Sequence, residues 1–331
     1  MFDLRNYNTF NLTVYAREGR EVHSIDDLKT PVTGPYIILG GGSDVLFTED
    51  FDGTVLINKI EGVSIEKRSD CYLVRAGGGL VLDDFIEQML SQDITGLENL
   101  SLIPGTVGAA PIQNVGAYGV EVGSLIESVE AVNLNDGSLR IFTHDECAFA
   151  YRHSIFKEPQ CRSYFITHVT FRLPLAFTPV QNYAGLQSCS FRDAGAVRNT
   201  VIALRNEKLP NPRHVGNAGC FFKNPYVQPE VLHALEKSFG KVPSWPAEDG
   251  SCKLAAGWLI DKAGCRGIRH GQVGTWGQQA LVIVNLGDAL PHEVLAMARY
   301  VSAEVKSKFS IDLVPEVRLY GKHGEREWEQ I

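Results

Sequence analysis

The chain has 331 residues, 44% of them hydrophobic and 21% charged, which is an ordinary composition for a globular protein. Its 39 acidic and 31 basic residues give a formal net charge of -8, and no Lys/Arg-rich run occurs, so we expect neither a nucleic-acid nor an anionic-membrane surface. The length predicts two or three domains.

Two further features narrow the class of protein. No apolar stretch approaches the roughly 18 residues of a membrane span, and the first ten residues lack the apolar core of a secretory signal. The seven cysteines show no C-x-x-C spacing, and His153, His168 and His270 have no partners at metal-ligand spacing. We therefore expect reduced thiols in a cytoplasmic protein, with no metal site.

The N-terminal half predicts short strands, one amphipathic helix and a long irregular segment. The helix follows Gly77-Gly78-Gly79 and carries Leu82, Phe85, Ile86 and Met89 at helical spacing. Strands are predicted at residues 36–39, 55–57, 63–65 and 72–76. Residues 95–124 are rich in Gly and Pro yet apolar, which favours a functional segment over a disordered one.

The C-terminal half continues with grouped strands and helices. A hairpin is predicted around Asn135-Asp136-Gly137, and a helix that ends before Pro210 marks a domain boundary. Further predictions are a strand at 164–173, a small-residue turn at 216–219, helices at 229–239 and 253–263, a strand at 280–285 and a last helix that begins near Pro291. Because the strands and helices are grouped and do not alternate strictly, the fold class is α+β.

A first glycine-rich segment, GGGSDVL at residues 40–46, follows a predicted strand. Consecutive glycines let backbone N–H groups crowd around a pyrophosphate. The dinucleotide pattern G-x-G-x-x-G is not met, because Val45 stands at its last position. A tight turn, the commoner reason for a glycine cluster, stays open at this point.

A second segment, PGTVGAAPIQNVGAYG at residues 104–119, is denser in small residues. Such residues let a flat ring system lie against bare backbone, whose N–H and C=O groups can bond its edge. A simple connector is the alternative. Ile112, Val115 and Tyr118 are unusual in a connector, so both interpretations remain.

Three single residues could carry chemistry. Arg152, in YRHSIFK, could hold a carboxylate with two hydrogen bonds, although an isolated Arg more often forms a surface ion pair. Cys220, in GNAGCFFKNP, could be a reactive thiol, although free cysteines are more often packing residues. Glu316 follows Pro315 in a strand-like run, where a carboxylate at a strand edge is the default interpretation.

Together and in this order, the segments resemble the UDP-N-acetylenolpyruvoylglucosamine reductase family. The match runs from Asn8 to Arg318, and seven segments in register over that length exclude coincidence. The matching segments are residues 38–47, 96–121, 151–157, 208–225, 249–261, 278–285 and 315–318.

The resemblance implies an FAD-binding fold of the vanillyl-alcohol-oxidase-like type with a third, substrate-closing α+β domain. It implies FAD-binding subdomains at residues 1–60 and 61–209 and a substrate domain at 210–321. The tail, residues 322–331, is expected to return to the FAD domain. Tyr183 matches the family form that has an additional tyrosine-bearing loop.

The resemblance also implies roles for individual residues. Arg152, Cys220 and Glu316 fall at catalytic positions. FAD contacts are implied for Gly40, Gly41, Gly42, Ser43, Asp44, Pro104, Gly105, Gly108, Ala109, Gln113, Asn114, Gly116, Tyr118, Gly119 and Arg318. Substrate or NADPH contacts are implied for Tyr151, Tyr183, Lys208, Asn224, Trp245 and Gln279.

The implied activity is the NADPH-dependent, FAD-mediated reduction of UDP-N-acetylglucosamine enolpyruvate to UDP-N-acetylmuramate. It belongs to peptidoglycan precursor synthesis, and so to cell-wall biogenesis, cell shape and division, in a cytoplasmic monomer. In this reaction Arg152 and Glu316 would stabilise charge on the substrate carboxylate, and Cys220 would donate a proton. A flavin oxidase of related fold acting on another small alcohol is the alternative, and a cysteine hydrolase would require an activating histidine.

Three residues depart from the family pattern. Cys220 stands where the family usually has Ser, and Asp44 stands where Asn is common. Trp245 occupies a place where the family often presents a substrate-contacting Tyr. The sequence therefore does not determine whether Cys220 donates the proton, how Asp44 meets a pyrophosphate, or whether Trp245 replaces the hydroxyl contact.

Overall fold

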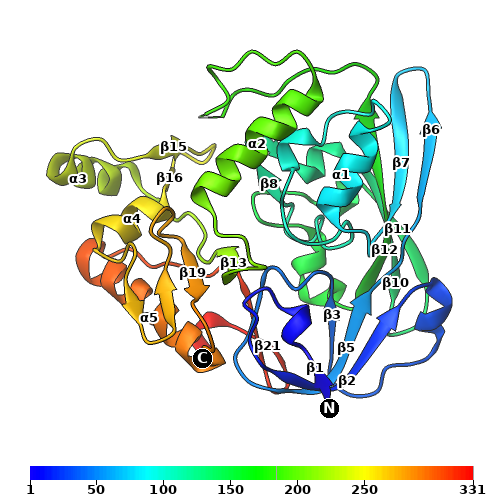
Figure 1. Cartoon of the computed structure of the whole chain (residues 1–331), viewed down its shortest axis with the longest axis horizontal. Helices are drawn as coiled ribbons and strands as arrows, with labels where there is room; N and C mark the ends of the chain where they lie inside the picture. The colour runs from blue at the N-terminus through cyan, green and yellow to red at the C-terminus, as the bar shows by residue number, and fades with distance from the viewer. Residues whose placement is uncertain (184, 331) are drawn as a thin grey trace.

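The computed structural model describes residues 1–183 and 185–330, which fold around three β-sheet cores (Figure 1). The first core is a four-stranded sheet in the order β1-β2-β5-β3, in which β2 and β3 both run parallel to β5. The strands are β1 (Phe2–Asp3), β2 (Tyr15–Val22), β3 (Tyr36–Leu39) and β5 (Phe51–Asn58). The sequence gives little sign of β2, because only Ala16 and Val22 within it are buried.

The second core is a five-stranded antiparallel sheet in the order β11-β10-β12-β7-β6. Its strands are β6 (Val63–Lys67), β7 (Cys71–Gly77), β10 (Ile126–Asn133), β11 (Leu139–Thr143) and β12 (Tyr164–Pro174). Helix α1 (Leu82–Leu90) buries the four apolar residues that its spacing predicts. Helix α2 (Ala194–Lys208) is capped at its N-terminus by Asp193, whose side chain accepts a hydrogen bond from the Ala196 N–H.

The irregular segment 95–124 lies against this second core. Leu97, Leu100, Ile103 and Val107 are buried in it, which explains the apolar content of a stretch without periodicity. A small hairpin, β8 (Gly116–Ala117) and β9 (Val120–Glu121), and short 3-10 helices at Glu98–Leu100 and Val122–Leu125 interrupt its turns.

The third core stands to one side of the other two (Figure 1). It contains a four-stranded sheet, a three-stranded sheet and three helices. The first sheet consists of β13 (Gly216–Cys220), β19 (Val282–Asn285), β18 (Val273–Thr275) and β17 (Arg269–His270). The second consists of β14 (Tyr226–Val227), β16 (Cys252–Leu254) and β15 (Ser244–Pro246), and the helices are α3 (Pro229–Phe239), α4 (Ala256–Lys262) and α5 (Pro291–Phe309).

Two sequence predictions in this third core are wrong. Residues 216–219 form strand β13 and not a turn, because β13 pairs with β19 and Gly216 packs so closely that a Cβ there would lie 2.2 Å from the Phe10 carbonyl oxygen. The helix predicted from residue 253 begins at Ala256, because Cys252–Leu254 pairs with strands on both sides.

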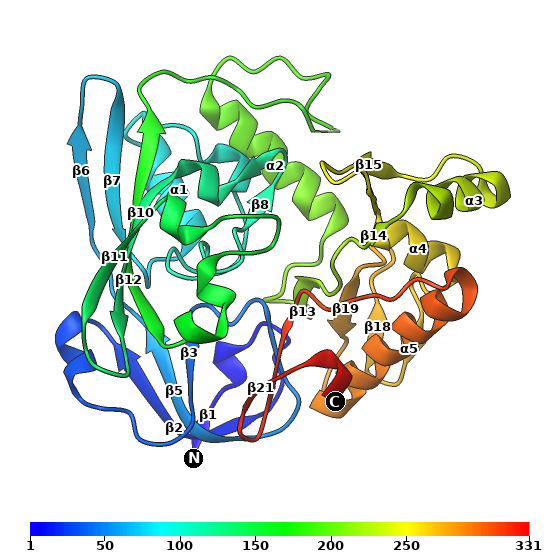
Figure 2. The ribbon, with the colours of Figure 1, turned by 180° about the vertical axis from the view of Figure 1, so that it is seen from behind.

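Residues 318–326 return to the first core (Figures 1 and 2). Strand β20 (Arg318–Gly321) pairs in parallel with β4 (Val45–Phe47) and antiparallel with β21 (Gly324–Arg326). Strand β20 thereby lies beside the glycine-rich loop that precedes β4. Beyond the hairpin, Trp328 packs on Phe222 and Arg299 of the third core. Within the described ranges, no helix has both the length and the apolarity of a membrane span.

Candidate active site

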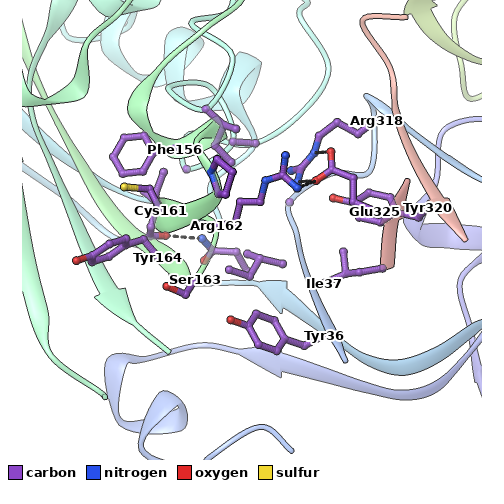
Figure 3. A pocket seen from close by; sticks show the side chains of 18 of the residues that line it. Tyr36, Ile37, Phe156, Cys161, Arg162, Ser163, Tyr164, Arg318, Tyr320 and Glu325 are labelled. Atoms are coloured by element: carbon purple, nitrogen blue, oxygen red, sulfur yellow. Dashed lines mark hydrogen bonds and ion pairs between the residues drawn. The ribbon is translucent and has the colours of Figure 1, made fainter. Parts of the chain in front are cut away.

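Two adjoining cavities lie between the first core, the second core and the returning strand β20. The larger has a volume of about 480 Å³, and Figure 3 shows Tyr36, Tyr164 and Arg318 among the side chains around it. The smaller, of about 90 Å³, runs between the two glycine-rich loops. Gly40, Thr106 and Arg318 line both, so the two cavities form one continuous site.

The two glycine-rich loops approach each other backbone to backbone. A Cβ on Gly41 would lie 3.0 Å from the Gly105 Cα, and Gly42 has a φ of 60° with no room for a side chain against the Tyr7 carbonyl. Glycine is required at both places, because any side chain would separate the loops or strain them.

The walls of this site fit FAD. A long cavity with a narrow, bare-backbone slot suits a dinucleotide that carries a flat ring, and Lys157 and Arg318 supply positive charge for a pyrophosphate. The Thr106 hydroxyl is buried at the junction of the cavities and has no hydrogen-bond partner among the described residues. A buried hydroxyl without a partner is costly, so a ligand atom at this place would satisfy it.

Most of the predicted FAD residues line these cavities. They are Gly40, Gly41, Gly42, Ser43, Asp44, Pro104, Gly105, Gly108, Ala109, Gln113 and Arg318. Gly116, Tyr118 and Gly119 instead form the β8–β9 hairpin, with Tyr118 and Gly119 in its left-handed turn. Asn114 is buried, and its side chain bonds the Gly123 N–H, Glu121 and the Ala150 carbonyl.

Arg318 is held in place by the C-terminal hairpin. Its guanidinium donates two hydrogen bonds to Glu325, at 2.8 Å and 2.7 Å, a bidentate pair visible in Figure 3. Burial alone would raise the pKa of Glu325, but the hydrogen bond and charge of Arg318 outweigh it and keep that pKa below its ordinary value. The tail thus orients a cation at the wall of the larger cavity.

Arg152 and Glu316 meet although 164 positions separate them in the chain. Arg152 lies in a tight turn closed by Ala150 and His153, with a φ of 53°, and its Nε lies 2.5 Å from Glu316 Oε1. That Nε is buried and forms no well-aligned hydrogen bond, so the contact between Arg152 and Glu316 is mainly electrostatic. Burial raises the pKa of Glu316 above its ordinary value, although the charge of Arg152 opposes this shift.

Cys220 lies at the end of β13, next to this ion pair. The backbone N–H of Glu316 donates to the Phe221 carbonyl at 2.8 Å, which joins the two segments. Burial and the nearby Glu316 raise the pKa of the Cys220 thiol to about 11, against the opposing charges of Arg152 and Arg205. The structure therefore brings Arg152, Cys220 and Glu316 together.

Arg205 is a site residue that the sequence analysis missed. It lies on α2, with its Nε buried and without a hydrogen-bond partner among the described residues, and its charge acts on Tyr118 and Cys220. Burial lowers its pKa. Its spacing in the sequence could have revealed it, because Arg205 lies four residues after Val201 on the helical face that Val197 and Val201 bury.

The predicted substrate residues fall into two groups. Tyr151 lies beside Lys253, whose Nζ is 4.3 Å from the Tyr151 ring and 5.8 Å from the Trp245 ring. The Asn224 side chain forms hydrogen bonds with Tyr151 and with the Ala256 N–H. This aromatic group joins the second and third cores. Lys253 was not predicted as a site residue, although it lies in the matching segment 249–261.

The remaining predicted residues, Tyr183, Lys208 and Gln279, line neither of the two cavities. The Tyr183 ring contacts Tyr118 edge to face at 5.1 Å. Lys208 is exposed in the last turn of α2, and Gln279 lies against Gly257, accepting a hydrogen bond from the Leu281 N–H. Among the described residues, these three side chains contact their own surroundings and not Arg152.

Comparison with known proteins agrees with this geometry. A family model described as UDP-N-acetylenolpyruvoylglucosamine reductase, C-terminal domain, matches residues 211–320, and one described as FAD binding domain matches residues 16–143. The UDP-N-acetylenolpyruvoylglucosamine reductase of Bacteroides fragilis is 41% identical over 326 residues, covering 96% of this chain and 98% of its own. That of Haemophilus ducreyi is 39% identical over 333 residues, covering 98% and 97%.

A solved structure supports the fold. The UDP-N-acetylenolpyruvylglucosamine reductase of Thermus caldophilus superimposes with a TM-score of 0.66 over 96% of both chains, at 24% identity. The FAD-binding fold with a C-terminal domain, predicted from the resemblance, is therefore confirmed.

Proposed function

The chain belongs to the UDP-N-acetylenolpyruvoylglucosamine reductase family, and from this premise we propose how its own side chains carry out the reaction. It is an FAD-dependent oxidoreductase that reduces UDP-N-acetylglucosamine enolpyruvate with NADPH in peptidoglycan precursor synthesis. The observation that carries the residue assignment is the meeting of Arg152, Cys220 and Glu316 beside cavities that fit FAD.

Bound FAD supplies hydride transfer between NADPH and the enolpyruvyl group. The two glycine-rich loops, with Lys157 and Arg318, would hold it. Because those loops meet backbone to backbone, they leave a slot whose width excludes side chains and orients a flat ring.

Arg152 and Glu316 would polarise the substrate. Reduction places negative charge on the enolpyruvyl carboxylate, and fixed donors there stabilise the transition state more than the ground state. Arg152 offers a planar cation held in a strained turn. Burial raises the pKa of Glu316, and this residue would take up a proton as the substrate carboxylate binds and donate a hydrogen bond to it. Cys220, which keeps its proton at neutral pH, would deliver it to the carbon that bears the ether oxygen.

The third core would close over the nucleotide sugar. We assign residues 1–60 and 61–209 to the FAD-binding part and 210–321 to this closing domain, a division supported by the three separate cores. Contacts with substrate or NADPH are proposed for Tyr151, Tyr183, Lys208, Asn224, Trp245 and Gln279. We place the enzyme in the cytoplasm as a monomer, and its seven free thiols support that location.

One experiment tests the function. The purified protein should be yellow, release FAD on denaturation, and oxidise NADPH only when UDP-N-acetylglucosamine enolpyruvate is added. A flavin oxidase acting on a small alcohol, which the full-length relatives do not favour, would instead take electrons from the alcohol and reoxidise in air. A colourless protein that binds no added FAD would refute the proposal.

A further inference from the structure

Asp44 occupies an unusual place at the head of strand β4. It lines the smaller cavity with Lys157 and Arg318, and its carbonyl accepts the Arg318 N–H at 3.0 Å, so the pairing of β4 with β20 fixes its backbone. Its carboxyl group forms no hydrogen bond or ion pair with the described residues, so only burial and the charges of its neighbours act on its pKa.

The cations around Asp44 are already engaged. Arg318 is paired with Glu325, Arg152 with Glu316, and Lys157 donates to the Arg152 carbonyl. The titratable and charged groups that face Asp44 are Glu316, Lys157, Arg318, Arg152, Cys220 and Tyr320.

The balance of these groups disfavours a charged Asp44. Burial and the Glu316 carboxyl raise the pKa of Asp44 well above its ordinary range, although Lys157, Arg318 and Arg152 oppose them. An anion bound beside Asp44 would favour the neutral form further, because like charges repel at short range.

We propose that Asp44 serves the FAD site as a neutral carboxylic acid, that its O–H donates a hydrogen bond to the bound cofactor, and that FAD binding is therefore coupled to proton uptake. The inference rests on the FAD site proposed above and adds a charge state to it. A carboxylate at this place would only accept hydrogen bonds and would repel a pyrophosphate, whereas an asparagine would donate at every pH.

The sign of the coupling follows from linkage. The FAD complex holds a proton on Asp44 that the free protein loses as the pH rises through the pKa of its Asp44. Above that point FAD affinity falls, by up to roughly tenfold per pH unit for one proton. Below it, affinity is constant with respect to this group.

The experiment titrates flavin-free protein with FAD at a series of pH values and follows the quenching of flavin fluorescence. Wild type should bind FAD progressively more weakly as the pH rises, whereas Asp44→Asn should lack that fall and bind more tightly at alkaline pH. Gly277→Ala, in open space away from the site, is the matched control and should follow wild type.

A second measurement covers the case in which Asp44→Asn does not fold. Calorimetry of wild type in buffers of different ionisation enthalpy, at a pH where FAD affinity has begun to fall, should show net proton uptake on FAD binding. Affinity that is independent of pH, or an unchanged pH dependence in Asp44→Asn, would overturn the inference while leaving the FAD site intact. Absence of FAD binding at every pH would overturn the proposed function as well.

Discussion

The Cys220 thiol has the pKa that a proton donor needs. Burial raises that pKa to about 11, so the thiol stays protonated at neutral and mildly alkaline pH. We predict that substrate reduction stays constant with respect to this group until the pH approaches about 11 and falls beyond it, whereas Cys220→Ser shows no such fall. Rapid-mixing measurements of the substrate-reducing half-reaction at each pH provide the test.

The same residue predicts a split between the two half-reactions. Cys220→Ala should accept electrons from NADPH normally but reduce substrate roughly 10²- to 10⁴-fold more slowly, because it lacks the proton donor. Cys220→Ser should retain activity, because a hydroxyl can replace the thiol. If Cys220→Ala reduces substrate at the wild-type rate, the residue only packs and the proton comes from elsewhere.

Arg152 and Glu316 should act on turnover and not on cofactor binding. Lys at position 152 keeps the charge but loses the planar two-point contact, and Gln at position 316 loses the acid. Each change should lower kcat roughly 10²- to 10³-fold while FAD affinity is retained. Arg75→Lys and Glu130→Gln, which alter a comparable ion pair of 2.9 Å on the second sheet, should leave kcat unchanged. Equal losses in both pairs would indicate a structural role.

At the scale of elements, the turn that presents Arg152 depends on a buried amide. Asn114 donates to the Ala150 carbonyl at 3.1 Å and accepts from the Gly123 N–H at 2.8 Å. Asn114→Ala should cost about 1–3 kcal/mol of stability and also lower kcat, because the turn would move. Asn285→Ala, which removes comparable bonds in the third core, should lower stability alone. Denaturant unfolding and steady-state kinetics of both variants separate these effects.

The approach of the two glycine-rich loops gives a second prediction at this scale. Gly41→Ala would place a Cβ 3.0 Å from the Gly105 Cα and force the loops apart. Overpacking of this kind costs about 1–3 kcal/mol, so FAD affinity should fall roughly tenfold to a hundredfold. The fluorescence titration measures the loss, with Gly277→Ala as the neutral control. Undiminished affinity would mean that the slot is wider than FAD requires.

At the scale of the whole molecule, the pair between Arg318 and Glu325 ties the tail to the cofactor site. The pKa of Glu325 is lowered in the folded protein, so its contribution to stability is present above the unfolded pKa near 4.5 and is lost as the pH falls through the folded value. Glu325→Gln should lower stability by about 1–3 kcal/mol at neutral pH and converge with wild type in acid.

The matched control is Glu66→Gln, in an exposed ion pair on strand β6. Its carboxylate is 65% exposed and lies 3.1 Å from Arg68, so its removal should change stability by less than about 0.5 kcal/mol. Thermal unfolding of both variants over a range of pH makes the comparison. Equal effects would show that Arg318 does not depend on its bidentate partner.

The sequence by itself determined the local elements and the nature of the cofactor segments. The buried faces of α1 and α5 follow from helical spacing, and the hairpin at Asn135-Asp136-Gly137 follows from turn chemistry. The two glycine-rich loops could be recognised from the sequence, because two backbones can approach each other this closely only where the residues are glycines. The order of the seven matching segments along the chain identified the family.

Only the tertiary structure decided which side chains meet and what charge they carry. Arg152 belongs to residues 61–209, whereas Cys220 and Glu316 belong to residues 210–321. Their meeting depends on the pairing of β20 with β4 and on how the third core packs against the second. Arg205 and Lys253 were not predicted as site residues, and Asn114 bonds the turn that presents Arg152. The physical reason is that burial and neighbouring charge, which set the pKa values of Cys220 and Asp44, arise from residues far apart in sequence.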